Sequence, residues 1–362
     1  MKRRTLLIGG GALAVAGFAG YRVMSARRAM QSTAIIDTVP SGGFGAETTA
    51  EQATAGLDLR DKTVLVTGAT SGLGLETMRV LAMRGAHVIG TGRTLDKAAA
   101  AMQGMTGRMT PAAVDLADFD SVAACAEAVH AISGTIDILI CNAGIMALPE
   151  LQQVYGLEKQ FVTNHLGHFL LVNKLLPQVT SAPQGRVVMV SSMGYRWAPA
   201  AGIEFDNLSG ERDYEPNKMY GQSKLANGLF SLELARRLKA MGSPATSNSI
   251  HPGVINTNLS RHFAKWKQLA GSLIGWTFMK SVEEGAATTV YVATYPELAE
   301  TSGYYFEDCN AVKPIGRMED APLAAKLWCV IRLRIRGDDE KPPGAARRLV
   351  TFLASPRKVT KR

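Results

Sequence analysis

The stretch that decides the fold is Thr63-Val-Leu-Val-Thr-Gly-Ala-Thr-Ser-Gly-Leu-Gly74. Residues 63–67 are β-branched or apolar, which is typical of a strand buried in a parallel sheet. Three glycines follow, and apolar residues then recur at helical spacing. This order forms the first half of a dinucleotide-binding unit: Gly68 allows a tight turn, Gly72 lets the backbone approach a pyrophosphate, and the helix N-terminus offers unpaired N–H groups. A glycine triplet alone is also compatible with an ordinary turn, so the remaining motifs must decide.

Strands and helices alternate along the rest of the chain, which indicates a parallel sheet with helices on both faces. The 362 residues are 46% hydrophobic and 20% charged, enough to bury a large core in one or two domains. We therefore predict an α/β doubly wound Rossmann fold with a parallel sheet of about seven strands. Strands are expected at residues 63–67, 86–91, 136–141, 185–190 and 246–250 and in a segment ending at 114–116, and helices at 118–132, 157–176 and 219–238.

The two ends of the chain differ from its body in charge. Of the net charge of +9, residues 1–28 contribute +6 and residues 331–362 contribute +7, which leaves −4 for the residues between them. We divide the chain into a signal or anchor segment (1–28), a linker with a short helix (29–57), a single Rossmann-type domain (58–330) and a basic C-terminal tail (331–362). Thr49-Ala-Glu-Gln52 matches a capping box and predicts the start of the short helix.

The N-terminal segment has the pattern of a targeting signal. Three basic residues, Lys2 to Arg4, precede an uncharged run over residues 5–21, and the run Arg3 to Leu7 (Arg-Arg-Thr-Leu-Leu) resembles the twin-arginine export signal. The uncharged run is at the lower limit for spanning a bilayer, so a cleaved signal and an uncleaved anchor both stay open. We expect a periplasmic or membrane-anchored protein, with a cytoplasmic, membrane-associated protein as the alternative.

Charge and composition narrow the classes of partner. Basic ends on a mildly acidic body favour membrane contact through the N-terminal segment and the tail. No stripe of interleaved arginine and aromatic residues is present, so we expect no nucleic-acid partner. The four cysteines have neither metal-ligand nor disulfide-framework spacing, and Cys141 is expected to be a small core residue. His165 and His168 lie on a mostly apolar helix and are interpreted as structural, so no metal site is predicted.

Two further strand ends carry residues suited to a dinucleotide. In enzymes that prefer NAD, an acidic side chain near the end of the second strand binds the ribose 2′-hydroxyl. Here Gly92 and Arg93 occupy that place, and a guanidinium pairs well with a 2′-phosphate. NADP is therefore the expected cofactor, and NAD stays open because a solvated loop arginine is the alternative interpretation. Asn142-Ala-Gly144 ends the fourth strand, where small residues let the backbone pack against a cofactor, although a plain Asx turn has the same pattern.

Tyr220 and Lys224 are four residues apart and stand one turn apart on the same face of the expected helix. A phenol with a pKa near 10 is a poor acid–base group at neutral pH, and an ammonium within about 5 Å would lower that pKa. Ser192 ends the fifth strand, at the edge where ligands bind in open α/β sheets, and its hydroxyl could orient a carbonyl. A single Tyr-x-x-x-Lys pair is also common by chance, so the joint pattern decides.

The joint pattern resembles the classical short-chain dehydrogenase/reductase family, and closely its retinol-dehydrogenase-like branch. The motifs that carry the resemblance are the glycine turn, Asn142-Ala-Gly144, Asn164 to Phe169, Ser192, Tyr220 with Lys224, Ser223 to Asn227, His251 to Val254, Gly303 to Phe306 and Ala325 to Trp328. The resemblance extends from about Phe44 to Trp328. The sequence departs from the family at Cys141, where Asn is usual, and throughout the tail after Trp328.

The resemblance implies a role for each motif residue. Tyr220 is the proton donor or acceptor, Lys224 lowers its pKa and holds the nicotinamide ribose, and Ser192 positions the substrate oxygen. Asn164 shapes the site and a water relay to Lys224. The implied cofactor-binding positions are Gly68, Thr70, Ser71, Gly72, Leu73, Gly74, Arg93, Asp115, Leu116, Asn142, Ala143, Gly144, Tyr220, Lys224, Pro252, Gly253, Val254 and Thr257.

The implied activity is that of an NADP-dependent oxidoreductase, which interconverts a small-molecule alcohol and a carbonyl compound by hydride transfer. Residues 258–280 are expected to form a substrate lid; their apolar residues recur at helical spacing and favour a bulky apolar substrate, with ordinary packing against the sheet as the alternative. A non-catalytic NADP-binding sensor or scaffold is the main alternative function, followed by an epimerase or dehydratase on the same fold. The sequence leaves the oligomeric state open.

Overall fold

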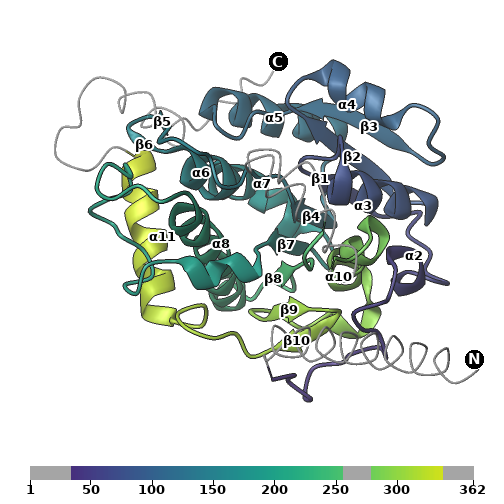
Figure 1. The fold of residues 1–362 in the computed structure, drawn as a ribbon. Coiled ribbons are helices and arrows are strands. Elements are labelled where there is room, and N and C mark those ends of the chain that lie inside the picture. Colours follow the sequence, from purple (N-terminus) through teal and green to yellow (C-terminus); the bar gives the residue numbers. More distant parts are fainter. Residues whose placement is uncertain (1–33, 256–278, 337–362) are drawn as a thin grey trace, which may run out of the picture.

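The computed structural model describes residues 34–255 and 279–336 (Figure 1). The predictions for the signal or anchor segment, for Thr257, for most of the lid and for nearly all of the tail therefore concern residues outside the described ranges. Within these ranges, no helix combines the length and the apolar character needed to cross a membrane.

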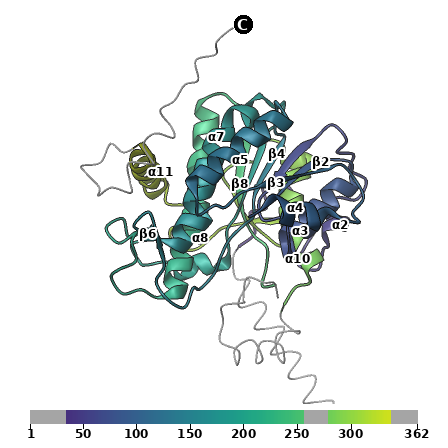
Figure 2. The same cartoon turned by 90° about the horizontal axis from the view of Figure 1, so that it is seen from above.

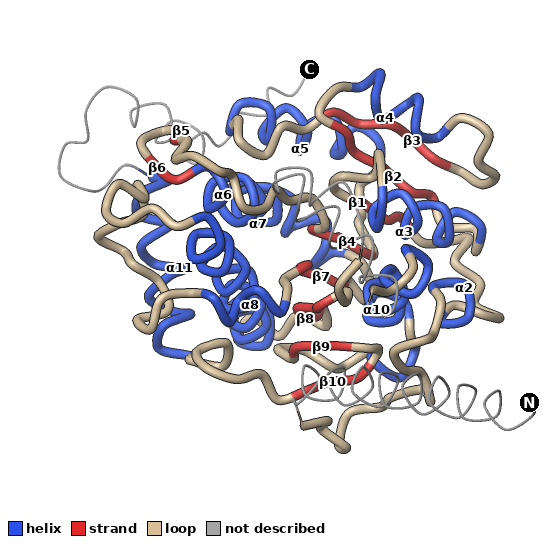
Figure 3. The backbone as a smooth tube through the Cα atoms, in the orientation of Figure 1, coloured by secondary structure: helices blue, strands red, loops and turns tan. Residues whose placement is uncertain are grey.

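One sheet runs through the middle of the molecule (Figure 3). Within the described ranges the sheet has eight strands, in the order β10-β9-β8-β7-β4-β1-β2-β3. The bounds are β1 (Thr63–Val66), β2 (His87–Gly92), β3 (Met109–Ala113), β4 (Ile138–Cys141), β7 (Arg186–Val190), β8 (Thr246–His251), β9 (Tyr305–Glu307) and β10 (Asn310–Val312). All neighbours pair in parallel except β9 and β10. The doubly wound parallel sheet is thus confirmed, with one antiparallel edge strand added.

The antiparallel strand has a local cause. Only Asp308 and Cys309 connect β9 to β10, and both residues have positive φ, 52° and 60°. A two-residue loop with both residues at positive φ is a hairpin turn, whereas a parallel return needs a crossover of a dozen or more residues. The last strand therefore folds straight back along β9.

Helices cover both faces of the sheet (Figure 2). One buried cluster joins the sheet to α3 (Gly72–Met83), α10 (Val282–Thr294) and α2 (Ala50–Ala53). The other joins it to α5 (Phe119–Ile132), α7 (Gly167–Ser181), α8 (Pro216–Ala240) and α11 (Ala321–Arg336). The short helix α4 (Leu95–Met102) packs beside β2 and β3. Cys141 has no exposed surface, which confirms it as a core residue.

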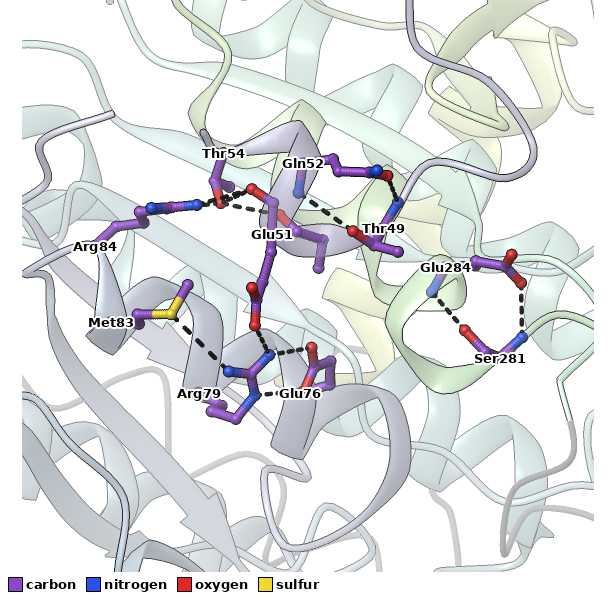
Figure 4. Close-up of polar contacts among 11 residues, drawn as sticks. Thr49, Glu51, Gln52, Thr54, Glu76, Arg79, Met83, Arg84, Ser281 and Glu284 are labelled. Carbon is purple, nitrogen blue, oxygen red and sulfur yellow. Dashed lines mark hydrogen bonds and ion pairs between the residues drawn. The ribbon is translucent and has the colours of Figure 1, made fainter. Parts of the chain in front are cut away.

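The short helix α2 is fixed to α3 by polar contacts (Figure 4). The predicted capping box is confirmed, because the Thr49 hydroxyl accepts the Gln52 N–H and the Gln52 side chain accepts the Thr49 N–H. Arg79 on α3 donates to Glu51 on α2 at 2.6 Å and also to Glu76 on its own helix. The segment before the domain thereby becomes part of the helical layer on this face.

Two element predictions were wrong in detail. The expected continuous helix 157–176 is divided into β6 (Leu157–Glu158), which pairs with β5 (Gln153–Val154), then α6 (Lys159–Phe161), a π-helical turn η1 (Val162–Leu166) and α7. The π turn coincides with Asn164, whose side chain bonds the backbone of another segment. The third strand ends at Ala113, because the Asp115 carboxylate accepts the Ala117 N–H and starts a turn.

Candidate active site

A cavity of about 330 Å³ opens at the carboxyl ends of the parallel strands, where the strand order reverses between β1 and β4. It brings together most of the predicted site residues from segments far apart in the sequence. Those that line it are Gly68, Thr70, Ser71, Gly72, Leu73, Gly74, Arg93, Asp115, Leu116, Asn142, Ala143, Gly144, Ser192, Tyr220, Lys224, Pro252 and Gly253.

The glycine turn leaves no room for side chains. A Cβ on Gly68 would lie 2.9 Å from the Cβ of Ala143, and a Cβ on Gly74 would lie 2.5 Å from the Asn142 side-chain nitrogen. Asn142 in turn donates to the Thr67 carbonyl at 2.9 Å. The first and fourth strand ends are therefore packed backbone to backbone, and the floor of the cavity is made of main chain.

The N-terminus of α3 faces this cavity. Ser71 is the N-cap residue, and its side chain makes no capping hydrogen bond. Gly72, Leu73 and Gly74 form the first turn and line the cavity. Their N–H groups have no partner within the helix and carry the positive end of its dipole. This arrangement fits the pyrophosphate of a dinucleotide.

The end of β2 carries two cations. A Cβ on Gly92 would lie 2.8 Å from Thr70 and 3.0 Å from the backbone nitrogen of Ala98, so no side chain fits there. Arg93 and Lys97 are exposed and line the cavity. Lys97 was missed by the sequence analysis; its spacing of four residues from Arg93, at the start of a helix, was the available signal.

Asp115 is the only acidic residue among the described residues that line the cavity. Its carboxylate is engaged by the Ala117 N–H, and its backbone N–H donates to the Ser121 hydroxyl at 2.9 Å. The neighbouring Leu116 is buried. These contacts hold both residues at the wall of the cavity.

The predicted reacting groups meet at the opposite end of the cavity. Tyr220 and Lys224 lie one turn apart on α8, each only 3% exposed. Ser192 follows β7, and its hydroxyl accepts the Gly194 N–H at 3.0 Å. The Lys224 ammonium donates to the Val190 carbonyl at 3.0 Å and lies 5.8 Å from the centre of the Tyr220 ring.

The electrostatics of this pair differ from the sequence expectation. Burial raises the pKa of Tyr220 to about 12, and the Ser192 side chain opposes this only in part. Burial also lowers the pKa of Lys224 to about 8. In the protein alone, burial thus outweighs any lowering of the phenol pKa by Lys224, because loss of solvation disfavours both charged forms; the effect of Lys224 itself stays a prediction.

Asn164 lies one layer behind the cavity rather than in its wall. Its side chain accepts the Ile145 N–H at 2.8 Å and donates to the Ile145 carbonyl and to the Ser223 hydroxyl, both at 2.9 Å. Its neighbour Thr163 lines the cavity instead. Asn164 therefore fixes the segment after Gly144 and the residue next to Lys224, and it makes no hydrogen bond to the lysine itself.

A buried network that the sequence analysis missed links these segments. The Thr67 hydroxyl oxygen accepts the N–H groups of Asn142 and Ala143 at 2.9 and 3.0 Å, and it lies 2.9 Å from His168 Nε2. His168 Nδ1 lies 2.9 Å from the Asn164 carbonyl oxygen. Burial lowers the pKa of His168 to about 4, so the ring is neutral at pH 7. His165 is also fully buried, and both histidines are structural as predicted.

The segment after β8 agrees with the prediction only in part. Pro252 and Gly253 line the cavity, but Val254 is 47% exposed and Ile255 lines the cavity in its place. Thr257 lies outside the described residues. Trp197, which the sequence analysis did not single out, is 47% exposed, and its ring centre lies 6.3 Å from that of Tyr220.

Comparison with known proteins places these features in a family. The family described as short chain dehydrogenase matches residues 62–268. Among curated proteins, the chain is 42% identical to the chloroplastic short-chain dehydrogenase TIC 32 A of Brassica napus, over 79% of this chain and 92% of that protein. It is 38% identical to human retinol dehydrogenase 14, over 76% of this chain and 87% of that protein.

Solved structures give the same result. An uncharacterized protein from Mycobacterium Paratuberculosis superimposes with a TM-score of 0.63 at 38% identity, over 77% of this chain and 95% of that one. RhlG of Pseudomonas aeruginosa, solved as an active-site complex with NADP, superimposes with a TM-score of 0.53 at 26% identity, over 69% of this chain and 95% of that one.

Proposed function

The chain belongs to the short-chain dehydrogenase family of NAD(P)-dependent oxidoreductases, and we propose that it uses NADP(H) to interconvert a bulky apolar alcohol and its aldehyde or ketone. The observation that carries the proposal is one cavity with Ser192, Tyr220 and Lys224 at one end and two cations at the other. The cavity follows the strand ends from β7 through β4 and β1 to β2, which is where a dinucleotide binds in an open α/β sheet.

The residues present fit such a cofactor. The uncapped first turn of α3 would hold the pyrophosphate, and Asp115 with Leu116 would flank the adenine. Pro252 and Gly253 would lie along the nicotinamide. When bound, the cofactor supplies the hydride acceptor or donor and, in its oxidised form, a positive charge.

Preference for NADP rests on the end of β2. Arg93 and Lys97 would both pair with a 2′-phosphate, and the backbone around Gly92 leaves no space for an acid that would bind the 2′-hydroxyl of NAD. RhlG, which was solved with NADP, supports the same choice.

Proton transfer falls to Tyr220. In the reducing direction, its hydroxyl donates a proton to the developing alkoxide, while the Ser192 hydroxyl orients the same substrate oxygen. Lys224, with a pKa of about 8, is mostly protonated at pH 7 and stabilises the phenolate that remains. Asn164 and His168 hold the surrounding backbone and do not touch the substrate.

The surroundings of the Tyr220 phenol support an apolar substrate. The half-exposed Trp197 ring offers a flat apolar surface next to Tyr220. Relatives that carry the name retinol dehydrogenase favour the same class. The lid at 258–280 lies almost wholly outside the described residues and stays a prediction.

The experiment is an activity series with NADPH and straight-chain aldehydes of increasing length. We expect kcat/KM to rise with length by up to about fourfold per methylene, since each buried methylene contributes about 0.8 kcal/mol. Trp197→Ala should flatten the rise, whereas Trp328→Phe, at a residue that does not line this cavity, should not. A flat wild-type series would contradict the apolar substrate. Cofactor binding without any turnover would support the alternative of a non-catalytic sensor or scaffold.

For localisation, we keep the proposal that residues 1–28 deliver the protein to or across a membrane. It is supported by the paired Arg3-Arg4 ahead of the uncharged run. Replacing both arginines by lysine should leave the protein in the cytoplasm, as measured by cell fractionation. An intact wild-type chain found wholly in the soluble cytoplasmic fraction would contradict it.

A further inference from the structure

A second cavity, of about 520 Å³, lies between α7, α8 and α11 and takes no part in the proposed reaction. Arg237 lines it from the C-terminal part of α8, seventeen residues after Tyr220. At 1.5 Å per residue this separates the two sites by roughly 25 Å along the helix. The volume lies within the range of about 300–1,000 Å³ that is usual for small-molecule sites.

One wall of this cavity is apolar and rigid. Trp328 on α11 stacks on Phe230 with ring centres 5.2 Å apart and an interplanar angle of 6°, and it also contacts Phe169. Leu176 and Leu234 continue the wall, which therefore suits a hydrocarbon chain.

The rim is cationic. Arg236, Arg237 and Arg332 line the cavity, and none of the described residues that line it is acidic. Arg236 and Arg237 both donate to one buried carboxylate, Glu233, so two guanidinium groups share a single negative charge. Arg332 is exposed and makes no ion pair or hydrogen bond with any residue that the structure describes. The rim thus keeps a net positive charge next to an apolar wall.

A buried donor also lacks a partner here. Trp328 is 5% exposed, and its indole N–H makes no hydrogen bond within the described part of the chain. The guanidinium of Arg237 lies 4.5 Å above the ring and holds it in place. A buried indole N–H is normally hydrogen-bonded, but this nitrogen has almost no accessible surface, so Trp328 contributes its ring and not its N–H to the cavity wall.

We propose that this cavity binds an anionic amphiphile, with its phosphate or carboxylate head among the guanidinium groups and its hydrocarbon chain along the aromatic wall. A cationic or sugar-headed amphiphile lacks the charge to pair with the rim. The chain's own tail is the competing occupant, because Asp338, Asp339 and Glu340 follow α11 directly in the sequence.

The test is calorimetric titration of the full-length protein, saturated with NADP⁺, with dodecyl phosphate below its micellar concentration. We expect one binding site, with much weaker binding of inorganic phosphate and of dodecyltrimethylammonium. Arg332→Gln should weaken binding about tenfold, which corresponds to the loss of one charge-assisted hydrogen bond. Arg334→Gln is the matched control: this arginine is exposed on the same helix but does not line the cavity, so affinity should stay within about twofold.

A second variant tests the aromatic wall. Trp328→Phe replaces the indole ring by a smaller aromatic ring, and it should weaken dodecyl phosphate binding several-fold without changing turnover of aldehydes. Absence of binding, equal binding of the cationic amphiphile, or equal loss in the Arg332 and Arg334 variants would overturn the proposal. It would also fail if binding appeared only after Asp338, Asp339 and Glu340 were changed to amides, because the tail would then be the occupant.

Discussion

At one end of the cofactor cavity Arg93 and Lys97 stand in solvent, whereas at the other end Tyr220 and Lys224 are each 3% exposed. The exposed charges keep their ordinary hydration. They can therefore select a cofactor by pairing with its 2′-phosphate, and dissolved salt weakens this attraction. The buried groups lose hydration, and the pKa values of Tyr220 and Lys224 move in opposite directions, to about 12 and about 8. In the proposed function, selection of the cofactor and transfer of the proton would thus rest on different electrostatics within one cavity.

The largest expected effect is at the buried end. Tyr220→Phe removes the proton donor and keeps the ring, so kcat should fall at least about 100-fold while the Kd for NADPH stays nearly unchanged. Stopped-flow turnover and fluorescence titration measure the two quantities. Near-normal turnover of the phenylalanine variant would show that another group transfers the proton.

Burial of the His168 side chain, behind this end of the cavity, should also make the free energy of unfolding depend on pH. The pKa of His168 is about 4 in the folded protein and 6.5 in the unfolded chain, so below pH 6.5 the unfolded chain binds more protons. The contribution of His168 to the free energy of unfolding is complete above pH 6.5 and is lost as the pH falls toward 4. At pH 5 the loss is about 2 kcal/mol.

Urea unfolding at pH 7 and pH 5 measures this loss. In His168→Gln the difference in unfolding free energy between the two pH values should shrink by about 2 kcal/mol relative to the wild type. Lys97→Ala, at the exposed end, is the control and should leave the difference unchanged. An unaltered difference in the glutamine variant would mean that His168 is not held neutral.

The smallest expected effect is at the exposed end. Arg93→Ala should weaken NADPH binding about tenfold and NADH binding little, because only NADPH loses a charge-assisted pair of about 1.5 kcal/mol. Lys97→Ala should act in the same direction but more weakly, and both effects should shrink at high salt.

Lys239 is exposed and does not line the cavity, so Lys239→Ala is the matched control for these variants. Equal losses of NADPH and NADH affinity in Arg93→Ala would show that Arg93 is an ordinary surface arginine. Loss of NADPH affinity in the Lys239 variant would point instead to a general effect of net charge.

The sequence was most informative where short-range chemistry decides the structure. The run 63–74 predicted the first strand, the turn and the helix because glycine and β-branched residues act on their own backbone. The four-residue spacing of Tyr220 and Lys224 predicted that both side chains lie on one face of a helix, because the local backbone sets their directions. The capping box at Thr49 and Gln52 also depends only on neighbours in the chain.

The tertiary structure decided what depends on distant residues. Asn164 lies in a π turn, and its side chain bonds both the N–H and the carbonyl of Ile145, nineteen residues away, a partner that its local sequence does not predict. His168 joins the site through Thr67, a hundred and one residues earlier. The direction of the Tyr220 pKa shift follows from burial by the whole fold, and no spacing in the sequence encodes that loss of water.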